Sequence, residues 1–258
     1  MGPVDRDAVT AVARLVAAAD QVVALTGAGV STASGIPDFR GPDGLWTRDP
    51  GAQRLASIDV YLEDGEVRRE VWRRRLSDSV LSARPNPSHA ALAELEQRGH
   101  LHTVVTQNVD GLHQAAGNAP DRVIEVHGTA REVMCLSCGR RVPMPQVLER
   151  VREGEHDPPC RQCGGLLKSA TVSFGQALDP AVLKAAHDAA LGCDLFLAIG
   201  TSLTVYPVAL LPRTAREAGA RLVIINGERT PYDDEADVVL RADTSATLTS
   251  LVEQLRKR

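Results

Sequence analysis

The sequence predicts an α/β protein built on a doubly wound parallel sheet, and three observations support this fold class. Short apolar runs alternate with segments of helical periodicity along most of the 258 residues. These runs are apolar at nearly every position, which is typical of strands buried on both faces of a parallel sheet. Glycine or polar residues follow directly after the runs, at the strand ends where such sheets bind ligands. We therefore expect the functional residues beyond the carboxyl ends of the strands.

The expected elements follow one another in a regular order. The strands, in chain order, are expected at 21–26, 101–107, 123–126, 195–199, 221–225 and 237–240. The helices that flank and separate them are expected at 5–19, 86–97, 180–191, 206–218 and 245–255.

Two segments interrupt this alternation. Residues 41–85 are rich in charge, proline and glycine, and residues 129–174 hold four of the five cysteines. We predict that these two insertions together form a small second domain. The large domain then consists of residues 1–40, 86–128 and 175–258.

Composition and charge exclude several classes of protein. No run approaches the ~20 apolar residues that span a bilayer, so we expect no membrane partner. The first 20 residues show no secretory signal, and we expect a cytoplasmic location. A net charge of -4 gives no overall attraction to nucleic acid, which is therefore an unexpected partner. The arginine cluster at 68–75 is interpreted as a solvated helix face, with anion binding as the alternative.

The four cysteines of the second insertion form two Cys-x-x-Cys pairs, Cys135 with Cys138 and Cys160 with Cys163. The pairs are separated by 21 residues, close to the spacing of paired zinc knuckles. Four thiolates fill a tetrahedral site and leave no position for water, so we predict one structural zinc ion. Two disulfides are the alternative, which a cytosolic location disfavours.

Gly27, Ala28 and Gly29 follow the first expected strand. A glycine turn at this place suits a pyrophosphate, although Thr32 stands where the general dinucleotide fingerprint has a third glycine. Taken alone, the turn is also consistent with a loop that binds nothing. The longer loop from 27 to 41 adds an acid, an aromatic ring and a cation beside the turn, in Asp38, Phe39 and Arg40. This combination favours a nucleotide site.

Two further strand ends carry candidate residues. His127 ends the run VIEVHG, and an imidazole with a pKa near 6.5 suits a general base, although strand-end histidines also serve structure. Asn226, Gly227 and Glu228 end the run RLVII, where an acid suits a pair of ribose hydroxyls or a helix cap. His113 is a weaker candidate because of its position near Asp110.

Taken in order, these motifs resemble the sirtuin family of NAD-dependent protein lysine deacylases. The shared stretches are GAGVSTASGIPDFRG, TQNVDGLH, the His127-Gly128 pair, both Cys-x-x-Cys pairs, GTSLTVYP and INGE, which cover about 22–228. The resemblance implies a Rossmann-like large domain, a small zinc module, and a cleft between them that binds NAD and an acyl-lysine peptide. NAD is then a co-substrate, and zinc takes no part in the chemistry.

The resemblance also implies a role for each matching residue. It assigns the NAD phosphates and ribose to Gly27, Ala28, Gly29 and Ser31, and the mobile loop around nicotinamide to Ile36, Asp38, Phe39 and Arg40. It assigns the nicotinamide pocket to Gln107, Asn108 and Asp110, and the diphosphate and ribose to Gly200, Thr201 and Ser202. It assigns the adenosine side to Asn226, Gly227 and Glu228, and the peptide to Val172, Phe174, Gly175, Leu203 and Val205. Phe174-Gly175 and 203–205 resemble two strands that clamp the peptide backbone.

The implied reaction is a transfer of the acyl group to ADP-ribose. The acyl oxygen of the modified lysine attacks the ribose carbon as nicotinamide leaves, in a pocket that Asn108 and Asp110 help to form. His127 then removes a proton from the ribose hydroxyls. The products are the free lysine, nicotinamide and an O-acyl-ADP-ribose.

Departures from the family pattern concern the acyl group. Relatives that remove succinyl groups carry Tyr-x-x-Arg, and the nearest match here ends at Arg75 with Trp72 in place of the tyrosine. Arg75 suits an acidic acyl tail, but the tyrosine hydroxyl is missing, so longer and acidic acyl groups stay open. Two further hypotheses are ADP-ribose transfer to protein at the same NAD site and a noncatalytic NAD-sensing zinc module.

Overall fold

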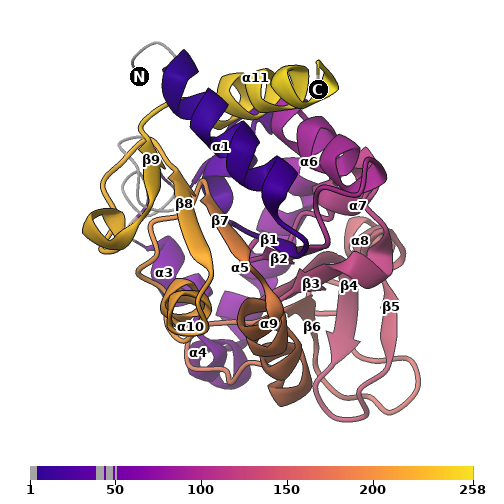
Figure 1. Cartoon of the computed structure of the whole chain (residues 1–258). Coiled ribbons are helices and arrows are strands. Elements are labelled where there is room, and N and C mark those ends of the chain that lie inside the picture. The colour runs from indigo at the N-terminus through magenta and orange to yellow at the C-terminus, as the bar shows by residue number, and fades with distance from the viewer. Residues whose placement is uncertain (1–4, 39–43, 45–48, 50, 258) are drawn as a thin grey trace.

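The computed structural model describes residues 5–38, 44, 49 and 51–257, and these form two sheets with helices packed around them (Figure 1). The large sheet has six strands in the order β3-β2-β1-β7-β8-β9, and every neighbouring pair is parallel. Its strands are β1 (Val22–Thr26), β2 (Thr103–Thr106), β3 (Val123–Glu125), β7 (Leu195–Ile199), β8 (Arg221–Ile225) and β9 (Val238–Leu240). The predicted doubly wound parallel sheet is confirmed.

The helices of the large sheet cover both of its faces (Figure 1). Along β1, Val22 and Ala24 belong to one core and Val23 and Leu25 to the other, as expected when side chains alternate across a strand. The first core is shared with α1 (Arg6–Ala18), α6 (Pro87–Gln97) and α11 (Thr244–Arg256). The second is shared with α9 (Pro180–Gly192) and α10 (Leu211–Glu217). Burial on both faces explains why the strands are apolar throughout.

The chain reverses its direction of travel across the sheet between β1 and β7. It moves outward from β1 to β3, returns to β7 beside β1, and moves outward again to β9. The strand order therefore reverses between β1 and β7, and ligands of open α/β sheets bind beyond the carboxyl ends of the strands at such a place. Short elements lie in these and other loops: α7 (Leu112–Ala116), η1 (Ala28–Val30), η2 (Thr32–Ser34), η4 (Pro120–Arg122), η5 (Val208–Leu210) and η6 (Asp233–Glu235).

The second sheet lies at the lower right of Figure 1 and has three antiparallel strands in the order β5-β4-β6. Its strands are β4 (Gly128–Cys135), β5 (Arg141–Pro143) and β6 (Leu167–Thr171), and α8 (Met144–Arg152) packs on them. The first insertion contributes α3 (Ala52–Leu55), α4 (Ile58–Glu63), α5 (Gly65–Leu76) and η3 (Ser79–Leu81). Trp72 of α5 shares a core with Val133 and Met144, so the two insertions contact each other. The predicted domain bounds stay a prediction.

Three details differ from the expected elements. The helix expected at 206–218 is a 3-10 turn followed by α10, and Pro212 lies in the first turn of α10, where its missing N–H is tolerated. Residues 203–205 lie in no strand, and Phe174 forms only an isolated bridge with Ser57, so the expected clamp strands have no regular sheet partner here. A bound peptide would supply that partner in strand addition.

Across the described ranges, none of the helices has the length and apolarity to cross a bilayer.

Candidate active site and metal centre

The loops after β1 and β7 approach each other closely through glycine. The amide of Gly27 donates to the carbonyl of Ile199 at 3.1 Å, and the amide of Gly29 donates to that of Gly200 at 2.9 Å. A Cβ atom on Gly27 would lie 2.7 Å from the Gly200 oxygen, and one on Gly200 would lie 2.6 Å from the Val30 nitrogen. These distances leave no room for a side chain. The glycines are required for the packing of the two loops, in addition to any ligand.

A buried hydrogen-bond network joins the β1 loop to the loop after β2. The side-chain amide nitrogen of Asn108 donates to the Gly27 carbonyl and to the Ser31 hydroxyl, both at 3.0 Å. Ser31 in turn donates to Asp110 at 2.7 Å, and the other oxygen of Asp110 accepts from the amide of Leu112 at 2.9 Å. Ser31, Asn108 and Asp110 are all buried. Residues that the sequence places 77 positions or more apart thus meet at one point of the sheet edge.

Two buried histidines lie behind this network. The Nε2 atom of His113 is 2.9 Å from the Thr26 hydroxyl, and that of His89 is 3.4 Å from the Ser31 hydroxyl. Burial lowers the pKa of His113 to about 3 and that of His89 to about 4, the latter against the attraction of Asp110. Both rings are therefore neutral at cellular pH.

His113 was only a weak candidate in the sequence, and His89 was not predicted. His89 is the third residue of α6, after the Asn86 cap, and its Nδ1 accepts from the Asn86 amide. His89 takes the N3 place of a capping box, where Glu or Gln is usual, and nothing in the local sequence signals its contact with Ser31.

His127 follows β3 and faces the loop after β2. Its Nδ1 is 2.9 Å from the Gln107 carbonyl oxygen, and because a carbonyl only accepts, Nδ1 carries the proton. The Nε2 atom then carries the lone pair that a general base needs. Burial lowers the pKa of His127 below 6.5, partly offset by the Gln107 carbonyl. Gln107 also donates to the Thr201 hydroxyl at 2.9 Å, which ties the loops after β2 and β7 together.

These contacts connect His127 with the β1 loop through consecutive residues. Gln107 holds the imidazole, and Asn108 bonds the Gly27 carbonyl. Phe39 and Arg40 lie outside the described residues, and Ile36 and Asp38 precede them.

The expected adenosine residues lie after β8. Asn226 is buried, and its side-chain amide donates to the Glu228 carbonyl at 2.9 Å. Arg241, directly after β9, donates to the same carbonyl at 2.5 Å. Gly227 and the Glu228 side chain are exposed beside them. In the β7 loop Thr201 is buried, and the hydroxyls of Ser202 and Thr204 are 2.8 Å apart.

The expected peptide residues lie near His127. The amide of Val172 donates to the His127 carbonyl at 2.8 Å. Phe174 is 47% exposed, and its backbone bonds Ala56 and Ile58 of the first insertion. Leu203 is buried with a φ of 55°, a left-handed conformation that is uncommon for a residue with a branched side chain. Gly175 is also left-handed at 82°, and Val205 is half-buried.

The acyl-pocket prediction is the least supported by the described contacts. Trp72 is 1% exposed and packs in the core of the small module. Arg75 pairs with Asp78 at 2.7 Å on the surface of that module. The ion pair accounts for the Arg75 guanidinium without an acyl group, whereas the buried Nε1 of Trp72 has no hydrogen-bond partner among the described residues. The role of both residues in binding an acyl group stays a prediction.

The four cysteines of the small module form a compact cluster. The Sγ atoms of Cys135 and Cys163 are 3.5 Å apart and those of Cys138 and Cys160 are 3.8 Å apart. All four sulfur atoms lie within 4.8 Å of one another. A tetrahedral zinc ion with Zn–S bonds of ~2.3 Å requires separations of ~3.8 Å, so the donor set fits zinc.

Comparison with known proteins identifies one family. The family model described as Sir2 family matches residues 27–207. NAD-dependent protein deacetylase 2 of Streptomyces coelicolor is 53% identical, over 91% of this chain and 97% of that protein. The NAD-dependent protein deacetylase of Haloarcula marismortui is 44% identical, over 98% and 96%.

Solved structures give the same result. One described as the basis for the mechanism and regulation of Sir2 enzymes has a TM-score of 0.87 and 38% identity, over 98% of this chain and 99% of that one. A Sir2 variant with a deacetylated p53 peptide and 3'-O-acetyl ADP-ribose has a TM-score of 0.87 and 34% identity, over 95% and 97%.

Proposed function

Because this chain belongs to the Sir2 family, we propose that it removes acyl groups from lysine side chains of proteins and consumes NAD in doing so. The products are the free lysine, nicotinamide and an O-acyl-ADP-ribose. The observation that carries the proposal is the set of hydrogen bonds through which Gln107 and Asn108 join His127 to the glycine loop after β1. These hydrogen bonds hold His127, the proposed base, and the glycine turn at one edge of the sheet.

The buried polar network is the part of the site that fits a nicotinamide riboside. When bound, NAD supplies an ADP-ribosyl group whose bond to nicotinamide can break. Asn108, Ser31 and Asp110 hold one another in fixed orientations, so they present an amide and a carboxylate without reorganisation. The neutral His89 and His113 behind them add no charge that would oppose a developing cation.

His127 is proposed as the general base. Its Nδ1–H is held by the Gln107 carbonyl, which fixes the ring and leaves Nε2 to accept a proton from a ribose hydroxyl. Because burial lowers its pKa below 6.5, the ring is unprotonated at cellular pH and ready to act.

The peptide is proposed to lie between Phe174 and 203–205. Phe174 offers exposed apolar surface, and its neighbour Val172 is bonded to the carbonyl of His127. An extended peptide placed there adds a strand and brings its acyl-lysine toward the base. Zinc, held by the four cysteines, is proposed to keep the small module folded and to take no part in the reaction.

The test is an assay of the purified protein with NAD and matched acetyl, longer-acyl and succinyl forms of one lysine peptide. Nicotinamide release should accompany loss of the acyl mass from the peptide. His127→Asn should abolish both signals, whereas His187→Asn, an exposed histidine on α9, should leave them unchanged. Nicotinamide release with labelling of protein and no deacylated peptide would instead identify ADP-ribosyl transfer. Absence of any turnover with every peptide would overturn the proposal.

A further inference from the structure

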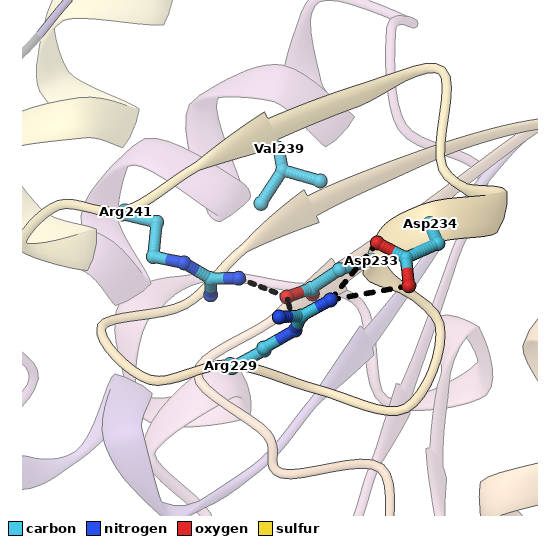
Figure 2. A pocket seen from close by; sticks show the side chains of 5 residues that line it. All are labelled: Arg229, Asp233, Asp234, Val239 and Arg241. Carbon is cyan, nitrogen blue, oxygen red and sulfur yellow. Dashed lines mark hydrogen bonds and ion pairs between the residues drawn. The ribbon is translucent and has the colours of Figure 1, made fainter.

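A cluster of ion pairs surrounds a pocket beside the proposed adenosine end of the site. Figure 2 shows the pocket, which has a volume of about 350 Å³ and is lined by Arg229, Asp233, Asp234, Val239 and Arg241. It lies in the connection from β8 to β9 and directly after β9, next to Glu228. Neither the zinc module nor the proposed base takes part in it.

Asp233 is the fixed centre of this cluster. Its side chain is only 7% exposed, and its carboxylate accepts from the Thr230 hydroxyl at 2.7 Å and from the Thr230 amide at 3.2 Å. The same carboxylate pairs with Arg241 and lies 3.8 Å from Arg229 (Figure 2). Burial alone would raise the pKa of Asp233, but the bonds from Thr230 and Arg241 outweigh it and lower the pKa. The carboxylate is therefore charged and held in place.

Both arginines adjoin the residue that is proposed to take the adenosine ribose. Arg241 donates to the Glu228 carbonyl at 2.5 Å, and Arg229 is the next residue in the chain. Arg229 also donates to both oxygens of Asp234, at 3.0 and 3.1 Å. Each guanidinium that lies close to Glu228 in this region is thus already paired with a carboxylate.

NADP differs from NAD by a phosphate on the 2'-hydroxyl of the adenosine ribose. Arginine is the side chain best suited to bind such a phosphate, because its planar fork matches the oxygens. Here Glu228, Asp233 and Asp234 supply three negative charges against two from Arg229 and Arg241. A 2'-phosphate would therefore meet a group of side chains with a net negative charge. Both arginines of this group already pair with carboxylates.

Resting on the proposed function, we propose that Asp233 makes the site selective for NAD over NADP by holding Arg241 and Arg229 in ion pairs. Both arginines could bind a 2'-phosphate if they were free. The ion pairs with Asp233 make them unavailable to it. Glu228 contributes to selectivity through its own charge, whereas Asp233 acts through the two arginines.

The test measures kcat/KM for NAD and for NADP in peptide deacylation. Asp233→Asn removes the charge but keeps an oxygen for Thr230, so NADP use should rise by at least about tenfold, the size expected of one charge-assisted hydrogen bond. Use of NAD should stay within about twofold. Asp188→Asn is the matched control, because Asp188 is 54% exposed on α9, pairs with Lys184 and does not line the pocket. It should leave the ratio of NADP to NAD use unchanged.

A double variant identifies the cation. Asp233→Asn combined with Arg241→Met should lose most of the gained NADP use. If Asp233→Asn unfolds, Asp233→Ser serves instead, because it also removes the charge with a shorter polar side chain, and the melting temperature is the check.

Two results would overturn the proposal: a folded Asp233 variant with the wild-type ratio of NADP to NAD use, or wild-type protein that uses both equally well. Absence of NAD-dependent deacylation by the wild type would refute the proposed function instead. Competition between ADP-ribose and its 2'-phosphate for binding would then still test the selectivity of the pocket.

Discussion

Replacing Arg131 with methionine is expected to slow deacylation while the fold and the zinc site remain. Arg131 lies on β4 of the small module, and its Nε donates to the backbone carbonyl of Asp110 at 2.7 Å. Its side chain lies against Gly111, where a Cβ atom would be 2.6 Å from Nε. The neighbouring amide of Ala130 donates to the Val109 carbonyl at 2.7 Å. One strand of the small module thus holds the loop that carries the residues proposed for the nicotinamide pocket.

The size of the effect follows from this single charged hydrogen bond. A bond from a charged donor contributes about 1.5–3 kcal/mol, and the half-buried position of Arg131 moves the expected loss toward about 1–2 kcal/mol because water replaces part of it. If the lost free energy is that which keeps Asn108 and Asp110 oriented in the transition state, kcat/KM falls roughly 5- to 30-fold. The Ala130 bond to the loop is retained, so the loop stays folded.

The assay is steady-state deacylation with NAD varied at saturating peptide, together with zinc content and melting temperature. We expect a lower kcat with unchanged zinc and a melting temperature within a few degrees of the wild type. Arg141→Met is the matched control, because Arg141 is an exposed arginine of the same sheet that pairs with Glu132. Wild-type kcat/KM in Arg131→Met, or an equal loss in Arg141→Met, would show that the Asp110 contact does not orient the site.

Two further predictions concern the metal centre and the base. Cys138→Ser is expected to lose zinc and to lower the melting temperature by roughly 10 °C, whereas Cys193→Ser keeps the metal because Cys193 is buried away from the cluster and donates to Ala190. Zinc analysis and a thermal melt check this, and a full zinc content in Cys138→Ser would contradict it. Since the neutral form of His127 is the proposed base and burial lowers its pKa, kcat/KM should rise with pH through a midpoint below 6.5 and stay level above it. A pH profile with its acidic midpoint above 6.5 would contradict this role.

The parts of the fold that were predicted correctly are those that local patterns determine. Apolar runs identified the strands of the large sheet because each of those strands is buried on both faces. The paired Cys-x-x-Cys spacing identified the cysteine cluster because each pair needs only one tight turn, and Gly139 and Gly164 supply the left-handed residue at 72° and 75°. The residues of each such pattern lie within a few positions of one another, so the pattern can be recognised in one sequence without knowledge of the tertiary structure.

The contacts that were missed join residues far apart in the chain. The sequence contains Arg131 in an insertion with no visible link to Asp110, and the three-stranded sheet that brings them together was not predicted. Charged residues interrupt the longer strands β4 and β6, and β5 has only three residues, so none of the three shows a continuous apolar run. The bond between Ser31 and His89 likewise depends on how α6 packs against the β1 loop. Tertiary packing, rather than local pattern, determines these positions.

The glycine turn after β1 has a second physical cause besides the predicted approach of a nucleotide. From the sequence, we explained Gly27 and Gly29 by the close approach of a pyrophosphate. The structure shows that a side chain at either position would also clash with Gly200, on which the β1 loop packs. Substituting either glycine therefore damages the protein whether or not a nucleotide binds, and loss of activity would not separate the two causes. Asp233 and Arg131 offer cleaner evidence, because each acts on the site through a side-chain contact that can be removed without filling occupied space.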